Sequence, residues 1–228
     1  MSLPPTTSRF FPPAESADAN GIVGWGGQLT TEWLLDAYRH GIFPWPMEHV
    51  ADEMLWWSLD PRAIFELTGL SVTRRLARRC RSGQFTVTSD RDFAGVIRGC
   101  GTAQNRAGNT WLTSDMIAAY EKLHAEGHAH SVEVWHGGEL AGGTYGIGIG
   151  GLFAAESMFY RVRDASKVAL VHLSDHLRHR GYVLWDIQQL TPHTESLGAI
   201  EIPRTEYLRR LRAAVELPVA FGNLNLEE

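Results

Sequence analysis

Cysteine is scarce in this chain, and long apolar runs are absent. Only Cys80 and Cys100 occur among 228 residues, with no CxxC pair and no zinc-ligand spacing. This usage predicts a protein of a reducing compartment, in which a disulfide is not expected. No apolar run approaches the roughly 20 residues that span a bilayer. The proline-containing N-terminus also lacks the apolar stretch of a signal peptide, so we expect a cytoplasmic protein without a membrane segment.

An excess of positive charge is also absent. The formal net charge is −5, so a nucleic-acid role would need a local basic patch. Residues 71–83, "SVTRRLARRCRSG", predict a short helix that carries such a patch: Arg74, Arg75, Arg78, Arg79 and Arg81. Like charges at i,i+4 spacing repel one another. The patch is either a solvated helix face or a phosphate-binding surface, and we favour phosphate because the rest of the chain is acidic.

The order of the predicted elements indicates the fold class. Residues 111–190 read as a helix, two strands, a helix and a strand, with helix caps at Thr113 or Ser114 and at Gly181. The second strand, "ELAGGTYGIGIGGLFAAESMF", is rich in glycine but has no phosphate-binding motif, so its glycines are predicted to make room for close neighbours. We therefore predict an α+β fold in which helices cover a mixed sheet.

Two polar residues interrupt the apolar strand in "YVLWDIQQLTPH", residues 182–193. Strand alternation predicts that Asp186 and Gln188 share one face. They could be a hydrogen-bonded pair that closes the end of a sheet, because a buried carboxylate without partners is costly. They could equally direct a proton in a dry pocket, since a carboxylate can polarise an amide or an amine.

A second acid lies in the apolar stretch "AAESMF". Alternation predicts Glu156 on the face of Met158 and opposite Phe153, Ser157 and Phe159. On an inner strand Glu156 could bind a cationic amine, and on an edge strand it would face water. No metal site is predicted: the helical series His172, His176 and His179 lacks the glutamate of an HExxH motif, so a solvated helix face is expected there.

Nine blocks of the sequence, taken in order, resemble the signature blocks of the leucyl/phenylalanyl-tRNA–protein transferases. They extend over roughly residues 22–208 and read "AYRHGIFPWP", "LWWSLDPRAIF", "TWLT", "GHAHSVEVW", "LAGGTYG", "ESMF", "ASKVAL", "DIQ" and "SLGAIEIPR". The resemblance implies a small N-terminal domain, residues 1–62, and a catalytic domain with a GCN5-related N-acetyltransferase (GNAT)-like fold, residues 63–228.

The resemblance also implies a reaction and its partners. Leucine or phenylalanine passes from an aminoacyl-tRNA to the α-amino group of a protein that begins with Arg or Lys, and the product is marked for degradation. The ester in the charged tRNA is already activated, so no cofactor, ATP or metal is implied. A monomer is expected.

The same resemblance implies roles for individual residues. Asp186 and Gln188 match a catalytic Asp-x-Gln strand that assists loss of a proton from the attacking amine, with Asp186 either orienting Gln188 or acting directly. Glu156 matches an acid that binds the ammonium group, and Ser157 lies beside it among the substrate-binding positions. Trp45 and Trp111 match positions near the terminal adenosine of the tRNA. The wall around the transferred side chain is assigned to Phe153, Met158, Leu170, Leu173 and Ile187, and the arginines at 74–81 to the tRNA acceptor stem.

Thr144 departs from the family pattern, which has a large apolar residue there, so the preference among Leu, Phe and Met is open.

Two other functions compete with aminoacyl transfer. A conventional acetyl-CoA-dependent acetyltransferase needs a Gly-rich turn before a helix, but "YRVRDA" at 160–165 has no glycine. A non-catalytic tRNA-binding module would give no reason for Asp186 and Gln188.

Overall fold

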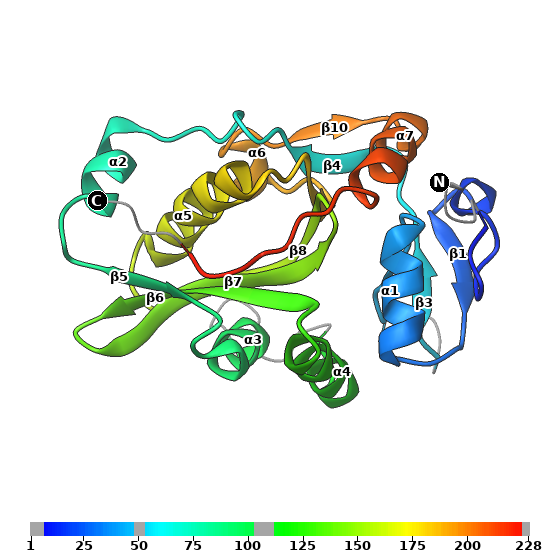
Figure 1. Ribbon diagram of the computed structural model, residues 1–228, viewed down its shortest axis with the longest axis horizontal. Coiled ribbons are helices and arrows are strands. Elements are labelled where there is room, and N and C mark those ends of the chain that lie inside the picture. The colour runs from blue at the N-terminus through cyan, green and yellow to red at the C-terminus, as the bar shows by residue number, and fades with distance from the viewer. Residues whose placement is uncertain (1–6, 48–52, 103–111, 225–228) are drawn as a thin grey trace.

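The structure is a computed structural model, which describes residues 7–47, 53–102 and 112–224. Its N-terminal part contains a small antiparallel sheet with the strand order β1-β3-β2. The strands are β1 (Ile22–Trp25), β2 (Phe43–Pro44) and β3 (Leu55–Trp57). Helix α1 (Thr31–Arg39) connects β1 to β2, and the helix and sheet form the right-hand side of Figure 1. A short 3-10 helix, η1 (Ala14–Ser16), precedes β1.

A larger sheet has the order β10-β4-β9-β8-β7-β6-β5. Its strands are β4 (Arg62–Phe65), β5 (Thr86–Ser89), β6 (Ala129–His136), β7 (Glu139–Ile149), β8 (Leu152–Tyr160), β9 (Leu184–Gln188) and β10 (Ile200–Ile202). All neighbouring pairs are antiparallel except β8 and β9, which run parallel. The sheet is therefore mixed, as predicted.

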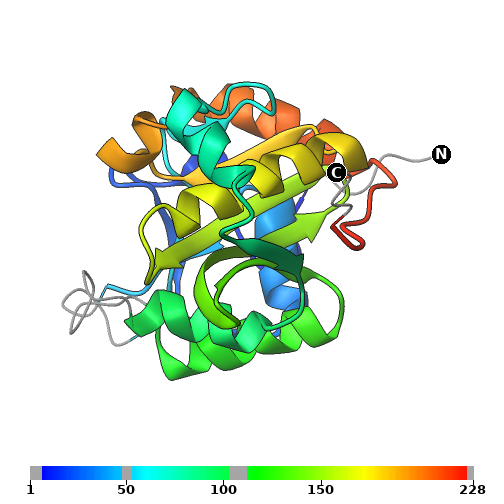
Figure 2. The same cartoon turned by 90° about the vertical axis from the view of Figure 1, so that its left-hand side faces the viewer.

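Helices cover both faces of the large sheet. They are α2 (Arg74–Cys80), α3 (Phe93–Thr102), α4 (Ser114–Ala125), α5 (Ala165–Arg180), α6 (Pro192–Glu195) and α7 (Arg204–Ala214). Helix α5 lies across one face, with α2 packed against it, while α3 and α4 lie on the other face (Figures 1 and 2). This arrangement confirms the predicted α+β class with a mixed sheet covered by helices.

The parallel pair β8 and β9 creates the most important irregularity of the sheet. The two strands pair over Leu152–Ala154 and Leu184–Asp186 only. Beyond these residues β8 continues to Tyr160 and β9 to Gln188 without pairing to each other. The strands therefore separate, and the gap between them lies where the chain places its polar residues.

One hydrophobic core joins the small sheet to the large one. Leu34 of α1 and Trp56 of β3 belong to the same buried cluster as Tyr120 of α4 and Tyr145 of β7. A second cluster lies under α5 and includes Phe65, Leu173 and Trp185. The domain boundary predicted between residues 62 and 63 stays a prediction, and residue 62 itself is the first residue of β4 in the large sheet.

Local signals placed most elements correctly. The side chains of Thr30 and Thr113 accept backbone N–H groups and cap α1 and α4, and α5 ends at the left-handed Gly181. The long strand predicted at 139–159 is wrong, because it is two strands, β7 and β8, joined by a turn at Gly150 and Gly151. Gly150 has a φ of +54°, which glycine adopts at little cost.

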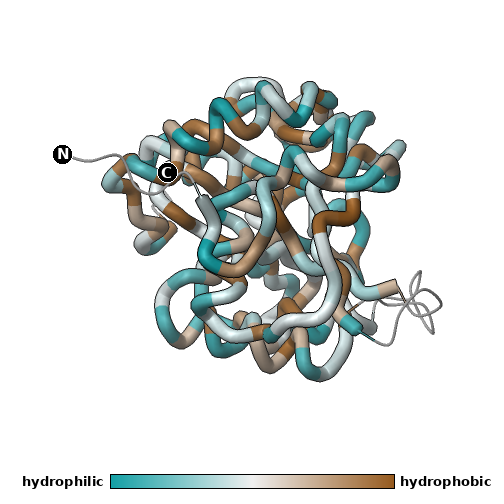
Figure 3. The backbone as a smooth tube through the Cα atoms, turned by 90° about the vertical axis from the view of Figure 1, so that its right-hand side faces the viewer, coloured by the Kyte–Doolittle hydropathy of each residue, from teal (hydrophilic) through white to brown (hydrophobic). Residues whose placement is uncertain are grey.

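Apolar residues are distributed in short groups along the chain. In Figure 3 brown hydrophobic and teal hydrophilic residues alternate along the tube rather than forming long runs. Among the helices of the described ranges, none combines the length and the apolar character needed to cross a bilayer.

Gly146 of β7 tests whether the glycines make room for neighbours. A Cβ atom there would clash with the carbonyl oxygen of Ala154 and the ring of Phe153. We expect Gly146→Ala to lower the free energy of unfolding by about 1–3 kcal/mol, measured by urea denaturation. Gly24→Ala is the control, because among the described residues no atom beyond its two chain neighbours lies within 4 Å of its added Cβ. Equal stability of the two variants would contradict the steric explanation.

Candidate functional site

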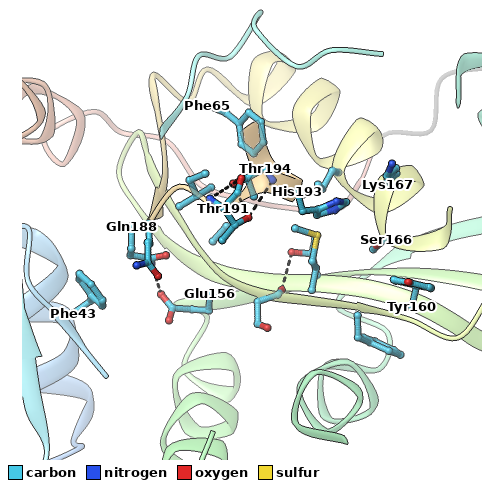
Figure 4. Close-up of a pocket in the computed structure, with 18 of the residues that line it drawn as sticks. Phe43, Phe65, Glu156, Tyr160, Ser166, Lys167, Gln188, Thr191, His193 and Thr194 are labelled. Atoms are coloured by element: carbon cyan, nitrogen blue, oxygen red, sulfur yellow. Dashed lines mark hydrogen bonds between the residues drawn. The ribbon is translucent and has the colours of Figure 1, made fainter. Parts of the chain in front are cut away.

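A cavity of about 790 Å³ opens where β8 and β9 separate. Its walls come from β2, β8, β9, the start of α5 and α6, so distant segments of the chain meet there. Figure 4 shows Gln188 and Glu156 at one end of the cavity, near Phe43, and Ser166 and Lys167 at the other. The cavity is thus chemically different at its two ends.

Asp186 lies beside this cavity in a buried ion pair with Arg62. Its carboxylate accepts hydrogen bonds from Nε and Nη2 of Arg62, at 2.9 and 2.7 Å, and from the Tyr207 hydroxyl at 2.8 Å. Asp186 is 0% exposed and Arg62 is 1% exposed. Burial acts to lower the pKa of Arg62, but the charge of Asp186, its hydrogen bond and the interaction with Tyr207 together hold that pKa above its usual value.

The Arg62 guanidinium is enclosed on its other sides as well. It lies between the rings of Phe43 and Tyr207, 4.7 and 4.5 Å from their centroids, and Nη1 donates to the Gly41 carbonyl at 3.1 Å. The pair therefore joins β4, β9, α7 and the segment after α1 in one fixed arrangement.

Gln188 is held by Asp186 but faces the cavity. Its backbone N–H donates to Asp186 Oδ1 at 2.9 Å, and its φ is +57°. The register between β4 and β9 shifts here, so Ile187 is an extra residue. The prediction that Asp186 and Gln188 share one face is wrong: Gln188 lines the cavity together with Ile187, and Asp186 does not.

Glu156 projects into the cavity from a second irregularity, in β8. The register with β7 shifts between Tyr145 and Gly146, which leaves Glu156 as the extra residue. Its Oε1 accepts from the Tyr38 hydroxyl at 2.8 Å and from Nε2 of Gln188 at 3.0 Å, and its Oε2 accepts from the Tyr120 hydroxyl at 3.0 Å. Because an ionised carboxylate only accepts, Gln188 presents its NH₂ to Glu156 in that state, which leaves its Oε1 for another donor.

Burial makes Glu156 an unusual carboxyl group. It raises the pKa of Glu156 to about 7, although the hydrogen bonds from Tyr38 and Tyr120 act in the opposite direction. Burial and the nearby Glu156 charge also raise the pKa values of both tyrosines well above the usual value, so they remain hydrogen-bond donors. At neutral pH the carboxyl group can therefore both take up and release a proton.

The predicted substrate-binding residues divide into two groups. Those that line the cavity with Glu156 are Trp45, Thr144, Ser157, Met158, Leu170 and Ile187. Phe153 and Leu173 do not line it, which corrects their assignment to the cavity wall. They are 1% and 0% exposed and pack into the core under α5, because β8 and α5 turn these positions inward. Trp111 lies outside the described residues.

The arginine cluster forms the predicted short helix, α2, which Thr73 caps. Two of its members approach the cavity: Arg79 lies 3.5 Å and Arg75 4.0 Å from Asp164, a cavity-lining residue. The assignment of Arg74, Arg75, Arg78, Arg79 and Arg81 to tRNA stays a prediction.

The histidine series on α5 is not a uniformly solvated face. His176 is buried, and its Nε2 lies 2.9 Å from the Phe221 carbonyl oxygen, so that expectation is wrong for His176. No group of three or more His, Cys, Asp or Glu side chains suited to a metal ion occurs within residues 7–47, 53–102 and 112–224.

Four residues of the site escaped the sequence reasoning: Arg62, Tyr38, Tyr120 and Tyr207. Arg62 follows a turn signal and resembles a surface residue, while the tyrosines occupy the buried faces of α1, α4 and α7. The signal that could have pointed to Arg62 and Tyr207 was Asp186 itself, since a buried carboxylate requires a hydrogen-bonding or cationic partner.

Comparison with known proteins identifies the family of this chain. The family model described as "Leucyl/phenylalanyl-tRNA protein transferase" matches residues 64–212, and the model of its N-terminal domain matches residues 27–60. The chain belongs to this family. A leucyl/phenylalanyl-tRNA–protein transferase of Solidesulfovibrio magneticus is 51% identical over 207 residues, 90% of this chain and 83% of that protein. One from Thiobacillus denitrificans is 48% identical over 222 residues, 96% of each chain.

Solved structures resemble the chain more distantly. A GCN5-related N-acetyltransferase-like protein from Streptococcus suis is 14% identical, with a TM-score of 0.36, over 76% of this chain and 65% of that chain. Because this TM-score is low, the α+β class rests on the chain's own mixed sheet and the helices that cover it. The GNAT-like part of the fold prediction stays a prediction.

The buried ion pair can be tested by removing one partner. We expect Arg62→Met to lower the free energy of unfolding by about 3–5 kcal/mol, because Asp186 would stay buried without its cation. The double variant Arg62→Met with Asp186→Leu should recover much of that loss. Arg98→Met is the control, since Arg98 pairs with Glu121 at 2.9 Å on the surface. Urea denaturation measures all three, and a loss below about 1 kcal/mol for Arg62→Met would contradict the analysis.

The raised pKa of Glu156 predicts a pH-dependent difference in stability. The folded protein favours the protonated form, so this contribution to stability is present below about pH 4.5 and is lost as the pH rises through about 7. Glu156→Gln stays neutral at every pH. We expect the variant to gain stability relative to the wild type between about pH 5 and pH 8 in urea unfolding. A constant difference across this range would rule out the raised pKa.

Proposed function

We propose that this chain transfers leucine or phenylalanine from an aminoacyl-tRNA to the α-amino group of a protein that begins with Arg or Lys. The observation that carries this proposal is the pair Glu156 and Gln188, a carboxyl group with a pKa of about 7 hydrogen-bonded to an amide in a cavity of a leucyl/phenylalanyl-tRNA–protein transferase family member. Peptide-bond formation from an ester needs an unprotonated amine, and this pair suits an incoming ammonium group.

The amine is handled in two stages. Gln188 Oε1 accepts a hydrogen bond from the incoming amine while its Nε2 stays on Glu156. Ionised Glu156 then binds the ammonium group and accepts its proton, for which a pKa near the working pH is suited. Asp186 acts as a positioning residue, since its oxygens are engaged by Arg62, Tyr207 and the Gln188 N–H.

The reaction balances without a cofactor. The amine nitrogen attacks the ester carbonyl carbon and a C–N bond forms. The bond from that carbon to the ribose oxygen breaks, and the ribose oxygen takes up a proton to become a hydroxyl group. The ammonium group loses two protons in all. Glu156 takes the first and releases it to solvent, and the second, lost as the C–N bond forms, supplies the hydroxyl group of the ribose.

The transferred side chain fits the apolar part of the cavity. Met158, Leu170 and Ile187 line this part together with Phe65. Thr144 also lines it, but its hydroxyl donates to the Ser157 carbonyl at 2.9 Å, so its methyl group is free to face an apolar side chain. We therefore propose that Thr144 leaves the cavity apolar enough for both Leu and Phe.

The donor tRNA contacts the rim of the cavity. Trp45 lines it and suits stacking with the terminal adenosine, an interaction worth about 1–3 kcal/mol per base. The arginines of α2 would contact acceptor-stem phosphates. The fate of the product as a degradation signal, the monomeric state and the cytoplasmic location stay predictions.

Transfer to model peptides tests the proposal. We expect labelled Leu and Phe to pass from charged tRNA to peptides that begin with Arg or Lys, and not to the same peptides with acetylated N-termini.

Gln188→Ala should lower kcat by about 100-fold, a typical effect of losing a group that assists proton transfer, with tRNA binding unchanged. Gln188→Ala is a cleaner variant than Asp186→Ala, which would leave Arg62 buried without its partner. Full activity of Gln188→Ala would refute the assigned role.

A further inference from the structure

The end of the cavity away from Glu156 gathers positive charge. Arg163 and Lys167, at the start of α5, and His193, on α6, all line it. Figure 4 shows Lys167, Ser166 and His193 at this end, and Tyr160 beside them. In the part of the chain that the structure describes, neither Arg163 nor Lys167 forms an ion pair. Their charges are therefore available to a ligand.

The N-terminus of α5 is left uncapped at the same place. The residue before the helix, Asp164, has a φ of +71° and makes no side-chain cap. Its carboxylate, which also borders the cavity, lies instead toward Arg79 and Arg75, which offset its charge. The backbone N–H groups of Ser166 and Lys167 have no acceptor within the described residues. Free N–H groups at the start of a 16-residue helix favour an anion.

Ser166 provides an independent indication of a ligand. It is only 3% exposed, it lines the cavity, and its hydroxyl has no hydrogen-bond partner in the ranges that the structure describes. The hydroxyl oxygen is not among the fully buried unpartnered atoms of the described residues, so it faces the open space of the cavity, where a ligand atom can reach it. A partner supplied by a bound molecule would have to lie in the cavity, next to Lys167.

The side chains of Lys167 and His193 also influence each other. Burial lowers the pKa of His193, and the charge of Lys167 lowers it further. The two side chains are therefore close enough to repel when both are charged. A bound anion between them would remove this repulsion.

We propose that Ser166, Lys167, Arg163 and the N-terminus of α5 bind the phosphodiester that links the last two nucleotides of the donor tRNA. This inference rests on the proposed function, which places the aminoacyl ester beside Gln188. Tyr160, 58% exposed, offers a face on which a base can stack. From Glu156 to Tyr160 the strand advances roughly 13 Å, at about 3.3 Å per residue, which leaves room for an aminoacyl group and its ribose.

The site also continues toward the arginine cluster of α2. Helix α2 packs on α5, as Figures 1 and 2 show, and Arg75 and Arg79 reach Asp164 at the border of the cavity. A nucleic-acid strand leaving the cavity past Lys167 would therefore meet a second group of cations. This continuity favours a polynucleotide phosphate over an isolated small anion.

The test compares two minimal donors that differ by one phosphate. Phenylalanyl-adenosine has no phosphodiester, and the phenylalanyl dinucleotide CpA has one. We expect the wild type to have about a tenfold lower KM for the dinucleotide, with a similar kcat, because a charge-assisted hydrogen bond is lost without the phosphate. Ser166→Ala and Lys167→Met should reduce this difference, while Arg178→Met, on the exposed far part of the same helix, should retain it.

The outcomes separate the possible failures. Equal KM values in the wild type, or a tenfold difference that persists in both variants, would overturn the phosphate site. Absence of transfer from both donors would instead refute the proposed function. Coenzyme A serves as a competing phosphate source: if it raises the Tm of the wild type but not of Lys167→Met, and CpA does not, the assignment to tRNA is wrong. Thermal unfolding of each variant confirms that it is folded.

Discussion

The buried ion pair between Arg62 and Asp186 is the constraint on which the site depends. It joins the first residue of β4 to β9, and through Tyr207 and Gly41 it also joins α7 and the segment after α1. A pair of charges at 0–1% exposure is tolerable only when every hydrogen-bonding position is satisfied. This requirement fixes the end of β9, and with it the left-handed backbone and orientation of Gln188.

The two polar groups of the cavity, Glu156 and Gln188, depend on irregular strands rather than on regular ones. Register shifts in β8 and β9 expose Glu156 and Gln188 to the same space, at the point where these parallel strands part. Regular alternation would have turned half of these side chains away. Helices α1 and α4 then add Tyr38 and Tyr120, whose hydroxyl groups limit the rise in the pKa of Glu156 that burial causes. The N-terminal part of the chain thus reaches Glu156 through Tyr38 of α1, which packs in the core shared with the large sheet.

The acidic and the basic side chains lie at opposite ends of the cavity. Glu156 and Gln188 occupy one end, and Lys167 and Arg163 the other, with the apolar residues Met158 and Leu170 between them (Figure 4). An aminoacyl ester of a nucleic acid has the matching order of an electrophilic carbonyl, an apolar side chain and a phosphate. In the proposed function an ammonium group would be attracted to the first end and a phosphate to the second, which would direct each substrate to its own side of the cavity.

The local sequence determined the helices, most strands and the α+β class. Helix caps, hydrophobic periodicity and glycine turns depend only on residues that are close together in the chain. Polar residues inside apolar strands singled out Asp186, Gln188 and Glu156, and the ordered blocks indicated the family and the roles expected of these residues. The sequence could not show that Arg62 neutralises Asp186 across 124 positions, that Ile187 and Glu156 are bulged, or that Phe153 and Leu173 turn into the core. These features depend on strand register and on partners distant in sequence. Only tertiary packing decides them, because the free energy of burying a charge depends on which groups surround it.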